Sequence, residues 1–303
     1  MTRLRTMINM SKPIVTSITL VLSVYTCESK GMTGAPELLK GVDTQVMLDN
    51  WSDHAKAWQK ITFKHQQKQF QIYQKEQSAG HSSIDDTKEF FSIFGESLSP
   101  SKKFLILQRG ETGTLYLEDG STKETELSHC EVINMSNGCV MQSRSAAYCT
   151  GQWTSDDEWI NQISGGGQQP PVLETPSPVQ LKEKIAKISS LDEKASIIQD
   201  QMYMGSASYL ACFPPSKSNI TDLNDIAYFL AESGKNQEAL EIYKALEIAT
   251  PSRMVLKLNM ADSLWAENQK PEAKSYYSDY KELMTKSGLT KKIPARVFER
   301  ISD

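Results

Sequence analysis

Apolar residues recur at helical spacing in the first third of the chain, between Met47 and Lys75. Intervals of three and four residues separate members of a largely aromatic series, namely Trp51, Ala55, Trp58 and Thr62, which Phe70 and Tyr73 continue. This spacing predicts an amphipathic helix whose stripe places Trp51 and Trp58 in a core. The alternative for these two tryptophans is an exposed platform for a sugar or a partner. Residues 79–81 would end this helix, and a second, short helix is predicted over 85–94.

The pattern changes after residue 100, where short apolar runs alternate with turn signals. Four or five antiparallel strands are predicted here, over the ranges 104–107, 114–117, 124–127, 130–134 and 140–143. Asn137-Gly138 favours a type I′ turn, in which both central residues have a positive φ. The sequence therefore predicts a small α+β domain over 46–163, in which two helices cover one face of a small antiparallel sheet.

A segment rich in glycine and proline follows, with the sequence SGGGQQPPVLETPSP from Ser164. Its composition predicts a linker over 164–180 and a domain boundary at this point. The remaining residues, 181–303, have helical patterns almost to the end and predict an all-α domain. A terminal capping helix is expected over 292–301, with Val297, Phe298 and Ile301 as its buried face.

Two segments of the all-α region align at an offset of 34 residues, from Leu223 to Pro251 and from Lys257 to Thr285. Six pairs of positions match in residue type, namely Ile226/Met260, Ala227/Ala261, Leu230/Leu264, Gly234/Asn268, Ala239/Ala273 and Tyr243/Tyr277. The alanines allow two helices to approach closely. Glycine and asparagine tolerate the left-handed conformation of a tight turn between helices.

This pattern resembles the tetratricopeptide repeat, whose period is 34 residues. The resemblance implies antiparallel helical hairpins that bind a peptide or protein segment along the face lined by their first helices. By position, it implies five partner-binding residues, namely Asn224, Tyr228, Leu258, Asp262 and Trp265. The family's basic clamp for a carboxylate is not expected, because Val255 and Asn259 stand at its positions. The alternative is that Tyr228 and Trp265 pack against flanking helices or the α+β domain.

The N-terminus carries Arg3, Arg5 and Lys12 before an apolar, uncharged run over 13–25. This arrangement predicts a secretory signal peptide over 1–26, followed by a tether over 27–45. A first core strand preceded by a tail is the alternative. Cys27 is a candidate lipidation site, with simple cleavage near Thr26 as the competing reading. We expect an exported protein in the periplasm or bacterial envelope, with a lipid anchor as one alternative.

Four further cysteines are candidates for two disulfides, namely Cys130, Cys139, Cys149 and Cys212. A disulfide between two of Cys130, Cys139 and Cys149 is favoured over a disulfide that includes Cys212. Their spacings of nine and ten residues do not match a zinc site.

The composition and the motifs of the chain exclude several classes of function. The formal net charge of the 303 residues is -4, which argues against a dedicated nucleic-acid binder. No apolar run reaches the ~18 residues of a membrane-spanning helix. No phosphate loop, dinucleotide fingerprint or paired-histidine motif is present, so no catalytic residue, metal or cofactor is predicted. We expect a non-enzymatic adaptor or scaffold whose partner is another protein or peptide. The alternatives are an envelope enzyme or small-ligand binder centred on 46–163, and an inhibitor or immunity protein that neutralises a partner.

Overall fold

The computed structural model describes residues 35–73, 88–94, 97–116, 120–161, 163 and 170–303. Several predictions concern residues outside these ranges. They are the signal peptide over 1–26, the candidate lipidation site Cys27, the helix end at 79–81 and the glycines of the predicted linker.

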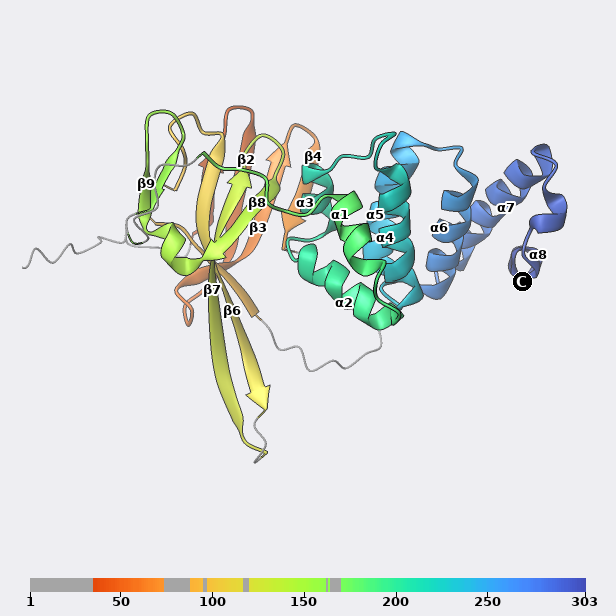
Figure 1. Cartoon of the computed structure of the whole chain (residues 1–303), viewed down its shortest axis with the longest axis horizontal. Coiled ribbons are helices and arrows are strands. Elements are labelled where there is room, and N and C mark those ends of the chain that lie inside the picture. The colour runs from red at the N-terminus through yellow and green to blue at the C-terminus, as the bar shows by residue number, and fades with distance from the viewer. Residues whose placement is uncertain (1–34, 74–87, 95–96, 117–119, 162, 164–169) are drawn as a thin grey trace, which may run out of the picture. The chain divides into compact units, whose positions relative to one another are not determined.

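An antiparallel sheet of eight strands dominates the N-terminal part (Figure 1). Its strands are β1 (Glu37–Lys40), β2 (Thr44–Ser52), β3 (Ala57–His65), β4 (Lys68–Ile72), β5 (Lys88–Ser92), β6 (Phe104–Tyr116), β7 (Thr122–Asn134) and β8 (Cys139–Ser145). The order across the sheet is β1-β2-β3-β5-β6-β7-β8. Strand β4 pairs with β3 as well, at other residues of β3 than the one that pairs with β5. A short 3-10 helix (Ala146–Cys149) and a two-stranded hairpin, β9 (Gly151–Trp153) and β10 (Trp159–Asn161), follow.

The predicted fold class of two helices plus a small sheet is wrong, because both predicted helices are strands. Trp51 and Trp58 are cross-strand partners in the β2–β3 hairpin, with ring centroids 5.0 Å apart. Their helical spacing arises because the turn between the strands interrupts a period of two. That period is visible in Val46 and Leu48 of β2, which are both fully buried. Trp58 lies in the core, as expected, with 3% of its surface exposed, and Trp51 is half-buried.

The five ranges predicted as strands after residue 100 are extended where the structure describes them, but the number of strands is wrong. The range 104–107 and residues 114–116 of the next range belong to one long strand, β6, and 124–127 and 130–134 belong to β7, while 140–143 lies in β8. The turn after β7 is also present, but its type differs. Gly138 has a φ of 80°, whereas Asn137 does not have a positive φ. A Cβ on Gly138 would lie 2.7 Å from the rings of Phe63 and Phe70, so this position requires glycine for space as well.

The C-terminal part is helical, as predicted. Its helices are α1 (Pro178–Ile185), α2 (Leu191–Gln201), α3 (Ser206–Cys212), α4 (Ile220–Glu232), α5 (Asn236–Ala249), α6 (Met254–Ala266), α7 (Lys270–Lys286) and α8 (Ala295–Ser302). Helices α4 and α6 begin and end at an offset of 34 residues, and α5 and α7 begin at the same offset. Gly234 and Asn268 both have a positive φ between the helices of a hairpin, which confirms the predicted turns.

The alanine and tyrosine columns of the repeat also occupy their predicted places. Ala227, Ala261, Tyr243 and Tyr277 are all fully buried. The small side chains let the first and second helices of each hairpin approach, and the tyrosine rings fill the space between them. The two hairpins therefore have the arrangement of a tetratricopeptide-like unit.

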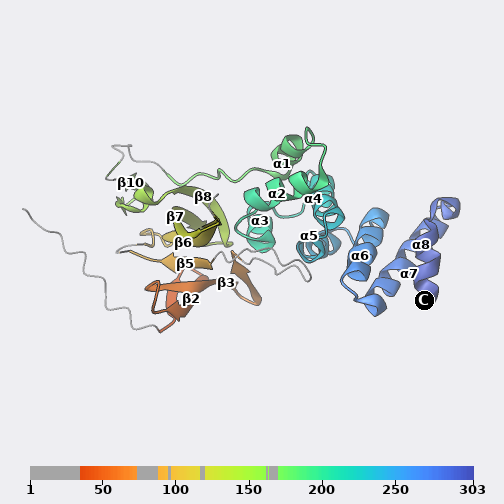
Figure 2. The same ribbon diagram turned by 90° about the horizontal axis from the view of Figure 1, so that it is seen from below.

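Helix α3 packs on β8 and β4, and in Figure 2 it lies beside the sheet. Ser208 of α3 donates a hydrogen bond to the Gly138 carbonyl (2.7 Å) and accepts one from the Val140 N–H (3.1 Å). One continuous cluster of buried apolar residues includes both sheet and helix side chains, such as Phe63 and Ile226. The sheet and the first helices consequently share a core.

Two disulfides use all four predicted cysteines. Cys130 bonds to Cys149, which agrees with the expected local pairing. Cys139 bonds to Cys212, the longer reach that the sequence disfavoured. The packing of α3 on β8 explains it, since this contact brings residues 73 positions apart to a Cα–Cα distance of 4.8 Å.

Candidate interaction site on the helical hairpins

The five predicted partner-binding residues lie on the first helices of the two hairpins, and we call them the first-helix face. Asn224 and Tyr228 belong to α4. Leu258, Asp262 and Trp265 belong to α6. The 34-residue register places Tyr228 and Asp262 at equivalent positions of successive helices.

The members of the first-helix face differ in how much surface they expose. Asn224 is buried and accepts a 3.4 Å hydrogen bond from the Asn259 side chain. Leu258 is half-buried against the core of the second hairpin. Tyr228 exposes 41% of its surface and lies edge-on to Phe229. Tyr228 is therefore the apolar side chain of the face that is open to a partner.

Asp262 accepts hydrogen bonds from three side chains, which together form what we call the Asp262 centre. Arg296 of α8 binds both carboxylate oxygens, at 3.0 and 2.8 Å. Arg300 donates to Oδ1 at 2.8 Å, and the Tyr277 hydroxyl donates to the same oxygen at 2.6 Å. Two guanidinium groups thus face one carboxylate, and the centre has a formal charge of +1.

The ring of Trp265 lies against the Asp262 centre. The Arg300 guanidinium lies 5.2 Å from the centroid of its ring, and the Lys270 ammonium lies 4.9 Å from it. These contacts are cation–π interactions. Trp265 is half-buried, and its contact with Arg300 joins it to the flanking helix α8.

The pKa values in the Asp262 centre follow from its charges. The hydrogen bond to Asp262 raises the pKa of the Arg296 guanidinium. Burial raises the pKa of the Tyr277 hydroxyl, and the Asp262 carboxylate raises it further. Asp262 therefore faces cations and a neutral phenol, and its own charge is already compensated. The groups available to a binding partner are the phenol of Tyr228 and the guanidinium groups of Arg296 and Arg300.

Helix α8 supplies the two arginines that were missed as site residues. Arg296 follows Asp262 by 34 positions, so the repeat spacing itself would have found it. Val297 is fully buried and Ile301 is half-buried, as expected of a capping helix. Phe298, however, was expected to be buried and exposes 41% of its surface. The capping helix thus covers the last hairpin and also extends the first-helix face.

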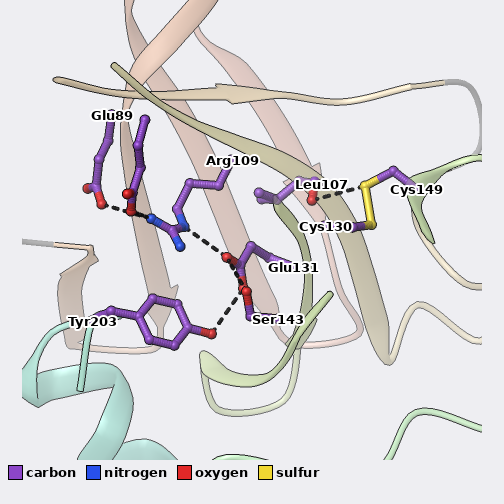
Figure 3. A network of polar contacts seen from close by, with 9 residues as sticks. Glu89, Leu107, Arg109, Cys130, Glu131, Ser143, Cys149 and Tyr203 are labelled. Atoms are coloured by element: carbon purple, nitrogen blue, oxygen red, sulfur yellow. Dashed lines mark hydrogen bonds and ion pairs between the residues drawn. A yellow bond between two sulfur atoms is a disulfide. The ribbon is translucent and has the colours of Figure 1, made fainter. Parts of the chain in front are cut away.

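A second network of charged groups is buried where the sheet meets the helices (Figure 3). Arg109 of β6 donates to Glu131 of β7 at 2.8 Å and to Glu89 of β5 at 3.2 Å, and it also pairs with Glu111. We call these four residues the Arg109 centre. It contains one guanidinium and three carboxylates.

Two tyrosines close the Arg109 centre, Tyr203 from the helical part of the chain and Tyr73 directly after the end of β4. The Tyr203 hydroxyl, from the segment between α2 and α3, donates to Glu131 at 3.1 Å. The guanidinium lies 4.9 Å from the Tyr203 ring centroid and 5.3 Å from that of Tyr73. Burial lowers the pKa of Arg109, but the surrounding groups, with Glu131 the strongest of them, together outweigh burial, and the pKa is raised. Burial raises the pKa of both tyrosine hydroxyls.

The described residues offer little for other kinds of site. Among them, no group of three or more His, Cys, Asp or Glu side chains is arranged to hold a metal ion. None of the described helices is long and apolar enough to cross a membrane.

Comparisons with known proteins add little. The sequence matches no protein-family model. No curated protein is significantly similar to it. Two solved structures of MamA, labelled MSR-1 and AMB-1, are similar to the chain, each with a TM-score of 0.28 and 12% sequence identity. Each covers 41% of this chain, and the matches cover 73% and 69% of the MamA chains. The tetratricopeptide-like arrangement is supported by the two hairpins themselves, whose first helices begin and end at an offset of 34 residues.

Proposed function

We propose that the protein is an exported, non-enzymatic interaction protein whose first-helix face binds a segment of another protein. The observation that carries the proposal is the exposed Tyr228 on the same face as Arg296, whose side chain is 42% exposed. Tyrosine and arginine are over-represented among the residues that dominate binding energy at protein interfaces. Repeat proteins use such surfaces, formed by equivalent positions of successive repeats, for partner recognition.

Export is part of the same proposal. Two disulfides suit an oxidising compartment such as the periplasm, because cytosolic thiols are kept reduced. The basic and apolar N-terminal sequence supports a signal peptide, and Cys27 is the residue that a lipid anchor would use. Mass analysis of the protein purified from the envelope would test both points. An N-terminus at or near Cys27 is expected, and a chain that retains Met1 would contradict export by cleavage.

Affinity capture from envelope extract tests the binding proposal. The bait is the chain from Cys27 to its end, and the test bait carries Tyr228→Ala with Arg296→Ala. Asp262 keeps Arg300 and Tyr277 in the double variant, so folding is expected to persist. A matched control is Ile248→Ala, because Ile248 of α5 is 87% exposed and lies outside the first-helix face.

One protein should be retained by the unsubstituted and control baits and lost with the double variant. A specific protein that is retained equally by all three baits would contradict the proposed face. Two truncations to alanine at an interface centre are expected to cost about 2 kcal/mol or more, which is roughly a 30-fold loss of affinity.

A further inference from the structure

Strands β6 and β7 continue beyond the rest of the sheet as a two-stranded ribbon (Figure 1). Their pairing extends to Tyr116 and Thr122, whereas β8 pairs with β7 only from His129 to Asn134. Seven residues of β7, Thr122–Ser128, therefore have a partner strand on one side only among the described residues. We call this side of Thr122–Ser128 the open edge.

The open edge lacks two of the features that protect sheet edges, a proline and a bulge. It contains no proline, and the bulge of β7 lies further along, between Val132 and Ile133. Residues 122–127 are all exposed. Alternate residues of an antiparallel strand direct both N–H and C=O groups outward, so several backbone groups face solvent. Such an edge is a template for another strand.

The side chains of the open edge divide by charge between its two faces. Alternation places Glu124 and Glu126 on one face and Lys123, Thr125 and Leu127 on the other. Leu127 exposes 62% of its surface. A strand added here would cover Leu127 and face two carboxylates spaced two residues apart.

The same charges oppose pairing with a second copy of the chain. When two copies of this strand pair antiparallel about a two-fold axis, the numbers of every two directly opposed residues add to the same sum. Both residues of such a pair point to the same face, so each register is centred on one residue. Registers centred on Glu124 or Glu126 place that glutamate opposite its own copy. The register centred on Thr125 places Glu124 opposite Glu126 twice. Every symmetric register that uses at least five of the seven residues thus opposes like charges, which is destabilising.

We propose that the open edge binds an extended segment of a different protein by strand addition. Charge complementarity requires Lys or Arg opposite Glu126 and Glu124, two residues apart in the partner. An apolar residue precedes the first of these basic residues and covers Leu127. Main-chain hydrogen bonds would provide affinity, and the alternating pattern of apolar and basic residues would provide specificity. This site is independent of the first-helix face.

The test uses synthetic peptides and the folded chain with its disulfides intact. The basic probe is Thr-Val-Lys-Thr-Lys-Glu-Thr, which complements residues 128 to 122 in antiparallel order. The matched control probe is Thr-Val-Glu-Thr-Glu-Lys-Thr. Binding is followed by amide NMR shifts, which also locate the site.

A charge-reversed chain carries Glu124→Lys with Glu126→Lys. The matched control chain carries Glu183→Lys with Glu272→Lys, which changes the net charge equally at exposed positions of α1 and α7. The basic peptide should shift residues 122–128 of the unsubstituted and control chains. The charge-reversed chain should bind it about tenfold more weakly, because two attractive pairs become repulsive.

Four results would overturn the proposal, and three of them concern the peptides. These three are equal binding of the acidic and basic peptides, shifts that lie outside 122–128, and no shift at millimolar peptide. Concentration-dependent self-association that broadens the same residues would also overturn it, because a second copy would then be the occupant.

Discussion

The Arg109 and Asp262 centres use the same chemical groups in opposite proportions. Each joins guanidinium, carboxylate and phenol, but Arg109 faces three carboxylates whereas Asp262 faces two guanidiniums. The Arg109 side chain is 4% exposed and that of Glu131 is fully buried. The Asp262 side chain is 31% exposed and that of Arg296 is 42% exposed.

Burial decides what each centre can do. A buried charge that loses its partner is costly, so the Arg109 centre has a fixed set of contacts that connects the sheet to the segment before α3. A half-exposed ion pair is exchanged with water at little cost. The Asp262 centre can therefore offer its arginines to a partner while the Arg109 centre cannot.

The largest expected effect comes from removing the buried cation. Arg109→Met leaves Glu131 and its neighbours without a counter-charge, and we expect a loss of about 3–5 kcal/mol in the free energy of unfolding. Denaturant unfolding measures it. The control is Arg144→Met, which removes a 39% exposed side chain paired with Glu174 and should cost less than about 1 kcal/mol. Equal losses for both variants would contradict the distinction by burial.

The Cys139–Cys212 disulfide connects the same two parts of the chain covalently. Replacing both cysteines by alanine should lower the free energy of unfolding by about 2–4 kcal/mol, because the unfolded chain regains the freedom of a long loop. Replacing Cys130 and Cys149, which are 19 residues apart, should cost less for the same reason. If the shorter loop costs as much, strain or lost packing and not chain entropy dominates.

Alkaline pH tests the tyrosines of the Arg109 centre. The pKa of Tyr203 in the folded protein is raised by burial and by Glu131. Tyr203 therefore ionises at a lower pH in the unfolded chain than in the folded protein. The contribution of this raised pKa to the free energy of unfolding is fully present below pH ~10. Above that pH the free energy of unfolding falls by up to about 1.4 kcal/mol per pH unit for each such tyrosine. Tyr203→Phe should flatten this fall, as measured by denaturant unfolding between pH 9 and 11.

A slope that Tyr203→Phe leaves unchanged would show that this hydroxyl is accessible in the folded protein. Tyr277→Phe is the matched change in the Asp262 centre. It should flatten the slope by a similar amount between pH 9 and 11, because burial and Asp262 also raise the pKa of the Tyr277 hydroxyl.

Asp262→Ala has the smallest expected effect on stability. The two arginines that lose Asp262 can turn to solvent, so we expect a cost of about 1 kcal/mol or less. Thermal unfolding beside Arg109→Met provides the comparison. A cost of several kcal/mol would mean that the Asp262 centre is as structural as the Arg109 centre.

The fold is predictable from the sequence where contacts are local and repeated. The helical hairpins were predictable because Ala227, Gly234 and Tyr243 recur 34 positions later in equivalent roles. Arg296 follows Asp262 by the same 34 positions, so this part of the Asp262 centre could also be predicted from the repeat.

The fold is not predictable from local patterns where strand pairing joins distant residues. Trp51 and Trp58 have helical spacing only because a turn lies between them, and Arg109 meets Glu131 only through the β6–β7 register. No local signal identifies either contact. The pairing of Cys139 with Cys212 likewise depends on how α3 packs against β8, which spacing alone does not reveal.

Site-specific photocrosslinking tests the central claim most directly, namely that the first-helix face binds a protein segment. A photoreactive phenylalanine analogue replaces Tyr228 in one chain and Ile248 in another, and both are illuminated in the envelope. We predict a discrete crosslinked species of defined mass from position 228 and none from position 248. The same species from both positions, or none from position 228, would contradict the claim.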